Sequence, residues 1–269
     1  MNVEDVWRQL DAFITENRFT ISVVFPVVGA FMLLLSAADI LPVWLAFNPF
    51  LILIGVLVMR LPLIGGVAPL VNRKVGVGTL FLCLYAYFIE YVGIQTGWPY
   101  GYFSYGVSLG PMVGGVPVML PILFLPLVLN AYLLGLLLFP SLSRWKRVLI
   151  TVGFVVAIDV VLDPGAVSLG FWSFEGSHWF YDVHMLNFLG WVLSAGISVF
   201  VFDTVFDRSM LKERLDSTPY MLDDLVSFVL LWGAVNAWYL NIVPVVVACL
   251  FGYGLIVVDR FSFPKWGER

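Results

Sequence analysis

Four carboxylates lie within or at the ends of long apolar runs of this 269-residue chain, at Asp39, Glu90, Asp159 and Asp163. An ionisable group inside lipid is energetically expensive, and such a group by default indicates a functional site. Asp159 and Asp163 are four residues apart, which places them about one helical turn apart on one face. A carboxylic acid kept neutral by apolar surroundings can donate a proton, and a second carboxylate can orient or deprotonate water. The pattern therefore predicts acid–base chemistry at membrane depth, with helix capping as the structural alternative for each carboxylate taken singly.

Eight apolar runs, each near the ~20 residues that a spanning helix needs, must position these groups. The chain is 61% hydrophobic and 12% charged, with a mean hydropathy of +0.97, which excludes soluble, disordered and disulfide-rich secreted classes. We expect an all-α polytopic transmembrane bundle. Its expected spans are 21–41, 49–70, 75–94, 112–139, 148–169, 185–206, 222–240 and 242–258. The last two spans are almost contiguous, so seven spans is the alternative.

The basic residues predict the orientation of the bundle. Of the 14 Lys and Arg residues, all except Arg60 lie before the first span, in alternate loops or after the last span. The opposite loops, 42–48, 95–110 and 170–184, contain none. The positive-inside rule makes the basic side cytoplasmic. We expect a multi-pass protein of the cell membrane with both termini in the cytoplasm and with the four carboxylates toward the outer surface.

The chain is expected to form a single integral membrane domain, 1–269. It would comprise an N-terminal interfacial segment (1–20), the bundle (21–258) and a cytoplasmic tail (259–269). Arg60 would either extend toward the inner surface or pair with a carboxylate, and Asp203 and Asp207 are expected to be helix caps. Pro164 disfavours helix at Asp163, which predicts a broken helix end there.

Aromatic residues crowd two outer loops. The first loop carries Trp98, Tyr100, Tyr102 and Tyr105, interleaved with Gly and Pro. An interfacial aromatic belt explains aromatic residues at this depth, but frequent Gly and Pro indicate tight backbone turns, which are tolerated only where they pack against protein or line a cavity. We expect these loops to be partly re-entrant.

Residues 90–105 read EYVGIQTGWPYGYFSY, residues 159–164 and 170–174 read DVVLDP and GFWSF, and residues 187–191 read NFLGW. These three segments resemble motifs of the membrane carotenoid-biosynthesis hydratases. The first is similar to the family's Glu-x-x-Gly-x-x-Thr-Gly-x-Pro-(Phe/Tyr)-Gly-x-Tyr-x-Tyr signature. Residues 159–164 with 170–174, and residues 187–191, resemble its Asp-x-x-x-(Asp)-Pro, Gly-x-Trp and Asn-Phe-x-Gly-Trp segments. The chain departs from the family at 181–184, where it reads Tyr-Asp-Val-His in place of Tyr-Gly-Val-Pro.

The resemblance implies hydration of an end-group double bond of an acyclic carotenoid without a cofactor. The acidic, Lys-poor composition favours the haloarchaeal branch, which converts bisanhydrobacterioruberin to bacterioruberin, over the branch that hydrates γ-carotene or lycopene. The expected partners are the carotenoid, membrane lipid and other membrane enzymes of carotenoid biosynthesis. A net charge of −4 without a basic patch excludes nucleic acid, and Cys83 and Cys249, both in apolar runs, predict no metal site.

The resemblance and the carboxylate pattern together assign roles. Glu90 is expected to protonate the alkene, Asp159 or Asp163 to act on the water, and Asn187 to orient it; the alternative is that an Asp of the pair is the acid. Residues expected to contact the substrate are Trp98, Tyr100, Tyr102, Tyr105, Trp172 and Trp191, with Asp39, Asp182 and His184 as auxiliary residues. A proton-coupled transporter is the alternative from another class, because intramembrane carboxylates also build proton relays.

Overall fold

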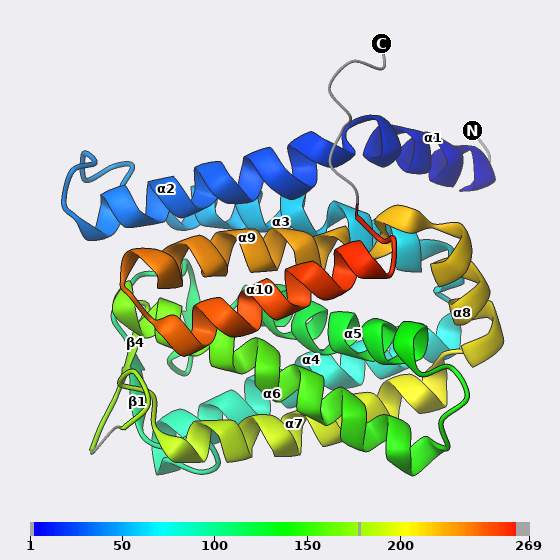
Figure 1. The fold of residues 1–269 in the computed structure, drawn as a ribbon. Helices are drawn as coiled ribbons and strands as arrows, with labels where there is room; N and C mark the ends of the chain where they lie inside the picture. The colour runs from blue at the N-terminus through cyan, green and yellow to red at the C-terminus, as the bar shows by residue number, and fades with distance from the viewer. Residues whose placement is uncertain (1–2, 177–178, 262–269) are drawn as a thin grey trace.

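Long helices lie side by side in the computed structural model, which describes residues 3–176 and 179–261 (Figure 1). The helices are α1 (Val3–Glu16), α2 (Phe25–Ala37), α3 (Pro49–Val67), α4 (Arg73–Thr96), α5 (Leu120–Leu138), α6 (Arg144–Ser168), α7 (Met185–Val205), α8 (Arg208–Ser217), α9 (Asp223–Trp238) and α10 (Ile242–Val257). A π-helical turn, Thr20–Val24, precedes α2, and short 3₁₀ turns, Ala68–Leu70 and Pro219–Leu222, follow α3 and precede α9. The predicted all-α polytopic bundle is confirmed.

Seven helical segments of the described chain are long and apolar enough to cross a membrane. They are Thr20–Ala37, Pro49–Leu70, Arg73–Thr96, Leu120–Leu138, Arg144–Ser168, Met185–Val205 and Pro219–Trp238. The eighth apolar helix, α10, has 16 residues and runs back beside α9 (Figure 1). As a result α1 and the end of α10 lie at the same end of the bundle. We call this the inner end, and the opposite end, which carries β1 and β4, the outer end.

Local sequence signals begin and end several of these helices. The side chains of Asn48 and Asn72 accept backbone hydrogen bonds at the first turns of α3 and α4, as N-cap residues do. Gly97 ends α4 in a left-handed conformation, with φ of 73°, which a residue without Cβ adopts readily. Asp207 is the N-cap of α8, as predicted.

The predicted helix break at Asp163–Pro164 is wrong, because α6 continues through Pro164 to Ser168. Proline removes one backbone donor from a helix, which leaves the carbonyl four residues earlier without its helical partner. Membrane helices tolerate proline where neighbouring helices pack against them, and Asn236 of α9 reaches the same turn of α6 with a 2.8 Å hydrogen bond to the carbonyl of Val161. Asp159 and Asp163 therefore lie on one continuous helix.

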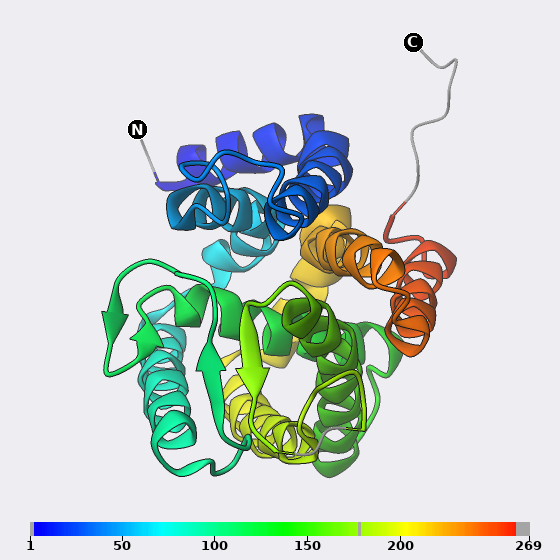
Figure 2. The same ribbon diagram turned by 90° about the vertical axis from the view of Figure 1, so that its left-hand side faces the viewer.

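Two small antiparallel sheets replace helix in the outer loops. The predicted span 112–139 begins late, at Leu120, because Met112–Val113 (β2) pairs with Val116–Pro117 (β3) in a hairpin. Phe103–Tyr105 (β1) pairs with Trp172–Phe174 (β4), although 66 residues separate the two strands. These strands lie across the outer end of the bundle, between α4 and α6 (Figure 2).

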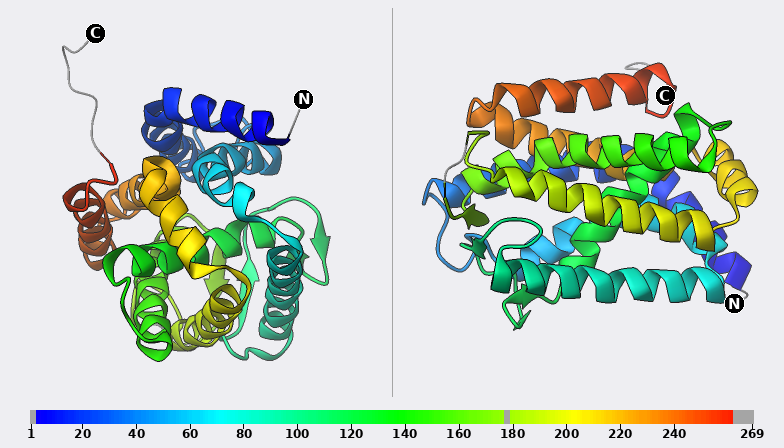
Figure 3. Two further views of the ribbon diagram at one scale, coloured as in Figure 1. Left: turned by 90° about the vertical axis from the view of Figure 1, so that its right-hand side faces the viewer. Right: turned by 90° about the horizontal axis from the view of Figure 1, so that it is seen from below.

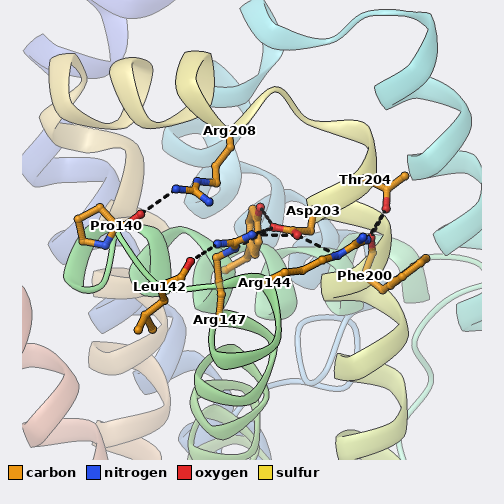
Figure 4. Close-up of polar contacts among 9 residues, drawn as sticks. Pro140, Leu142, Arg144, Arg147, Phe200, Asp203, Thr204 and Arg208 are labelled. Carbon is orange, nitrogen blue, oxygen red and sulfur yellow. Dashed lines mark hydrogen bonds and ion pairs between the residues drawn. The ribbon is translucent and has the colours of Figure 1, made fainter.

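Ion pairs at the inner end join helices far apart in the sequence. Asp203 was predicted to be a cap, but it accepts ion pairs from Arg147 at 2.7 Å and from Arg144 at 3.3 Å (Figure 4). It cannot cap a helix because it lies inside α7, where the backbone donors already have helical partners. Arg60 forms a buried ion pair with Asp224 at 2.5 Å, which resolves its two sequence alternatives in favour of pairing.

The N-terminal segment forms a helix, α1, which packs against α3 at the inner end (Figure 3). Ile14 is fully buried there, beside Gly65. The basic residues Lys265 and Arg269, at the end of the predicted tail, lie outside the described residues.

Candidate functional site

The β1–β4 sheet presents an aromatic face toward the bundle. Strand alternation places Phe103, Tyr105, Trp172 and Phe174 on one face, partly buried, whereas Ser104 and Ser173 are exposed on the other. Tyr105 is the cross-strand partner of Trp172, and the two rings meet edge to face with centroids 6.4 Å apart. Aromatic side chains therefore form a cover over the outer ends of α4 and α6.

Glu90 lies beneath this cover, in the outer half of α4. The phenol of Tyr105 donates a hydrogen bond to Glu90 Oε1 at 2.5 Å. Burial and the neighbouring Glu90 raise the pKa of Tyr105 well above its usual value, so its hydroxyl remains a neutral donor. The loop that carries the aromatic residues thus also fixes the orientation of the carboxyl group.

Asp159 and Asp163 are held together by one amide. Asn187, in the first turn of α7, donates to Asp159 Oδ2 at 3.0 Å and also to Asp163 Oδ2. All three side chains are buried. Asp159 Oδ1 is buried and accepts no hydrogen bond from an N–H or hydroxyl donor in the described part of the chain. The Asp159 and Asp163 carboxyl groups are within hydrogen-bonding reach of each other, so the pair can share one proton.

Tyr100 connects the outer loop to α7. Its hydroxyl is 2.7 Å from Ser194 Oγ, which is also 2.9 Å from the hydroxyl of Tyr85 on α4. The Tyr100 ring packs against Gly190, where a Cβ would come within 2.2 Å of it, so any larger residue would displace the ring. Trp191 follows, stacked on Phe124 with centroids 5.5 Å apart.

Sequence analysis missed Tyr85 and Ser194, which belong to this polar group. A signal existed for Ser194, because it lies seven residues after Asn187 and so on the same face of a helix. Nothing in the sequence marked Tyr85 among the other aromatic residues of its span.

The phenol groups of Tyr100 and Tyr105 lie near both Glu90 and the Asp159–Asp163 pair. Tyr105 is close enough to interact electrostatically with both Glu90 and Asp163, and Tyr100 with both Glu90 and Asp159. α4, α6 and α7, which carry the three carboxylates and Asn187, run alongside one another (Figure 3).

Carboxylates that are buried or half-buried at the two ends of the bundle differ in their partners. Three at the inner end form ion pairs with arginine: Asp203 with Arg147, Asp223 with Arg18 and Asp224 with Arg60. Glu90, Asp159 and Asp163 form no ion pair with any residue that the structure describes; their donors, Tyr105 and Asn187, are neutral. A buried carboxylate without a cationic partner is costly to ionise, so the outer group is suited to holding a proton.

Several predicted site residues lie away from this group. Trp98 and Tyr102 are 57% and 51% exposed, and Asp39 and Asp182 are exposed in loops. Asp182 adopts a φ of 60° where the family signature has Gly. His184 is the N-cap of α7, where its Nδ1 accepts from the backbone N–H of Leu186 at 3.1 Å.

Within residues 3–176 and 179–261, no three His, Cys, Asp or Glu side chains are grouped in a way that could hold a metal ion. His178, in the second outer loop, lies outside those residues.

Comparison with known proteins gives two matches. The profile of a family described as "Carotenoid biosynthesis protein" matches residues 47–255. The chain is also similar to the bisanhydrobacterioruberin hydratase of Haloarcula japonica, with 55% identity over 262 residues, which cover 96% of this chain and 89% of that protein. No solved structure matches the chain significantly.

Proposed function

Because the chain belongs to the carotenoid biosynthesis protein family, we propose that it is a carotenoid hydratase that converts bisanhydrobacterioruberin to bacterioruberin. The extent and identity of the match to the Haloarcula japonica hydratase support this substrate over γ-carotene or lycopene. The reaction adds water across an end-group C=C bond, and it is redox-neutral because it needs neither an oxidant nor a reductant.

One observation carries the proposal for the site: a half-buried glutamate, Glu90, and two buried aspartates, Asp159 and Asp163, lie beneath an aromatic cover with no cationic partner in the described part of the chain. Hydration of a trisubstituted alkene needs a strong acid that protonates carbon, and then water that traps the resulting tertiary cation. An acid kept neutral by burial can supply the proton. Aromatic faces stabilise a cation by about 0.5–2 kcal/mol each without reacting with it.

In the proposed mechanism Glu90 is the proton donor. Tyr105 occupies Glu90 Oε1, which leaves Oε2 to carry the proton. The π electrons of the alkene take this proton to form a C–H bond on the less substituted carbon, and the adjacent carbon becomes a tertiary cation. Trp172 and its neighbours on the sheet shelter the cation from premature capture.

Water then completes the reaction. Its oxygen forms the C–O bond to the cation, and it loses one proton to the aspartate pair, whose two carboxyl groups are within hydrogen-bonding reach of each other and share the charge. Asn187 holds both aspartates in place. Transfer of that proton back to Glu90 restores the starting state, so the net change is addition of one water. In the alternative assignment a protonated aspartate is the acid and Glu90 acts on the water.

The location of the site is part of the proposal. We place residues 1–269 as one integral membrane domain, with the bundle 21–258 in the cell membrane and both termini in the cytoplasm, because the basic residues gather at the inner end. The reacting end of a carotenoid that lies along the helices would then reach the carboxylates near the outer surface. Other membrane enzymes of carotenoid biosynthesis would supply the substrate.

The test is conversion by the purified protein. It is incubated in lipid vesicles with bisanhydrobacterioruberin in ¹⁸O-enriched water. The pigments are then separated by chromatography, and their masses are measured by mass spectrometry. We expect more polar products that each contain one heavy oxygen per hydrated end, and none with heat-denatured protein. Absence of any product from folded protein would refute the hydratase function.

A further inference from the structure

An elongated cavity of about 440 Å³ lies between the α2–α3 pair and α5, α6 and α9. Its walls are almost entirely apolar, and they extend along α3 from Asn48 near the outer end to Arg60. These residues are twelve apart, so at ~1.5 Å per residue the cavity follows the helix for about 18 Å. That is more than half of the ~30 Å hydrocarbon core of a bilayer.

The outer end of this cavity meets the aromatic cover of the carboxylate site. Trp172 lines the cavity, and its ring also contacts Tyr105, which donates to Glu90. Leu162, which precedes Asp163 on α6, is a second shared wall. Between the cavity and Glu90 therefore stand two rings in contact, Trp172 on the cavity side and Tyr105 on the carboxyl side.

The cavity is also accessible from lipid. Val28 on α2 and Ile54 on α3 line it, yet they are 53% and 56% exposed on the apolar surface of the bundle. An apolar molecule could thus enter sideways from the membrane without crossing the polar loops. At the inner end Arg60 Nε and Ser227 Oγ are buried without a hydrogen-bond partner in the described chain, and they set the inner limit for an apolar occupant.

We propose that this cavity binds the polyene chain of the carotenoid, next to the end group that is hydrated. The inference rests on the proposed function, which supplies a long apolar substrate whose end must reach Glu90. The chain lies along α3, its end group passes Trp172 to the carboxylates, and the remainder leaves to lipid between α2 and α3. Burial of the chain adds binding energy remote from the reacting bond, which an enzyme can use to position that bond.

The test fills the cavity. Gly55 lines it about 10 Å along α3 from Asn48, and a Cβ added at Gly55 has no heavy atom within 4 Å. Gly55→Phe therefore places a ring in the empty space. The matched control is Gly153→Phe on α6, a helical glycine that also has open space around its Cβ but is exposed and does not line the cavity.

Each variant is assayed with two substrates. One is bisanhydrobacterioruberin, and the other is a truncated analogue with the same end group and a chain too short to reach Gly55. We expect Gly55→Phe to lower kcat/KM for the long substrate by about tenfold or more and to leave the short one unchanged, whereas Gly153→Phe changes neither. Normal turnover of the short analogue also shows that the variant is folded.

The outcomes separate the two proposals. If the parent protein converts neither substrate, the hydratase function itself fails. If the parent converts both and Gly55→Phe converts the long substrate like the parent, the cavity does not hold the polyene. An equal loss of kcat/KM for both substrates would also contradict the inference. Gly55→Leu, which adds a smaller side chain to the cavity, should show the same selective loss for the long substrate.

Discussion

The phenol of Tyr105 donates to Glu90 Oε1 at 2.5 Å, and this bond joins the aromatic cover of the bundle to a carboxyl group on α4. Tyr105 belongs to β1, which pairs with β4 and packs against α4. The orientation of Glu90 thus depends on a sheet assembled from two outer loops.

Replacing Tyr105 by Phe removes this hydrogen bond and keeps the ring. We expect kcat to fall about tenfold to a hundredfold, because Glu90 is no longer held toward the alkene, while KM changes little. Steady-state turnover of bisanhydrobacterioruberin is the measurement. Tyr253→Phe, which removes an exposed hydroxyl from α10, is the control. A parent-like kcat in Tyr105→Phe would show that the bond does not position Glu90.

Asn187→Leu should impair both stability and activity. The substitution nearly conserves volume but removes the amide that Asp159 and Asp163 share. Leaving buried acceptors unsatisfied costs about 1–3 kcal/mol, and we expect a lower thermal midpoint in detergent together with loss of turnover. The control is Asn17→Leu, which removes one side-chain amide hydrogen bond, to the carbonyl of Phe13 at the inner end. This variant should keep full activity. Unchanged stability and turnover in Asn187→Leu would mean that the bridge has no role.

Arg60→Met tests the buried ion pair with Asp224. The variant leaves the Asp224 carboxylate buried without a cationic partner and with only the neutral amide of Asn130 as a donor. Breaking a buried ion pair in this way costs about 3–5 kcal/mol. Urea or thermal unfolding should therefore show a large loss. The double variant Arg60→Met with Asp224→Leu should regain most of it, because no lone charge remains. If the double variant is no more stable than the single one, the pair is not the source of the effect.

The orientation predicts where the ends of the chain lie. A cytoplasm-dependent reporter fused at Gly267 should be active, whereas the same reporter inserted at Glu175 should be silent. A reporter that works only outside the cell should give the reverse pattern. Equal signals at both positions would contradict eight spans with cytoplasmic termini.

Much of the bundle was predictable, because a spanning helix needs a long apolar run and basic residues mark one side. The predicted span 49–70 coincides with α3 and its 3₁₀ turn. The prediction was wrong where long-range contacts override local preference. Pro164 lies within α6 at a turn that packs against α9, where Asn236, 72 residues later, donates a hydrogen bond to the carbonyl of Val161.

The site was predictable in composition but not in geometry. Depth alone grouped Glu90 with Asp159 and Asp163. It could not show that Tyr105 bonds Glu90 while Tyr102, three residues earlier, is half exposed. That distinction depends on the pairing of β1 with β4, which two short segments so far apart in the sequence do not reveal.

The most direct test of the account is Glu90→Gln in the purified protein. Glutamine keeps the shape of the side chain and can still accept from Tyr105, but it cannot deliver a proton to carbon. Loss of a general acid lowers the rate by about 10²–10⁴, so we expect turnover of bisanhydrobacterioruberin to fall at least a hundredfold while the thermal midpoint stays near that of the parent. Turnover near the parent rate in this variant would contradict the assignment of Glu90 as the proton donor.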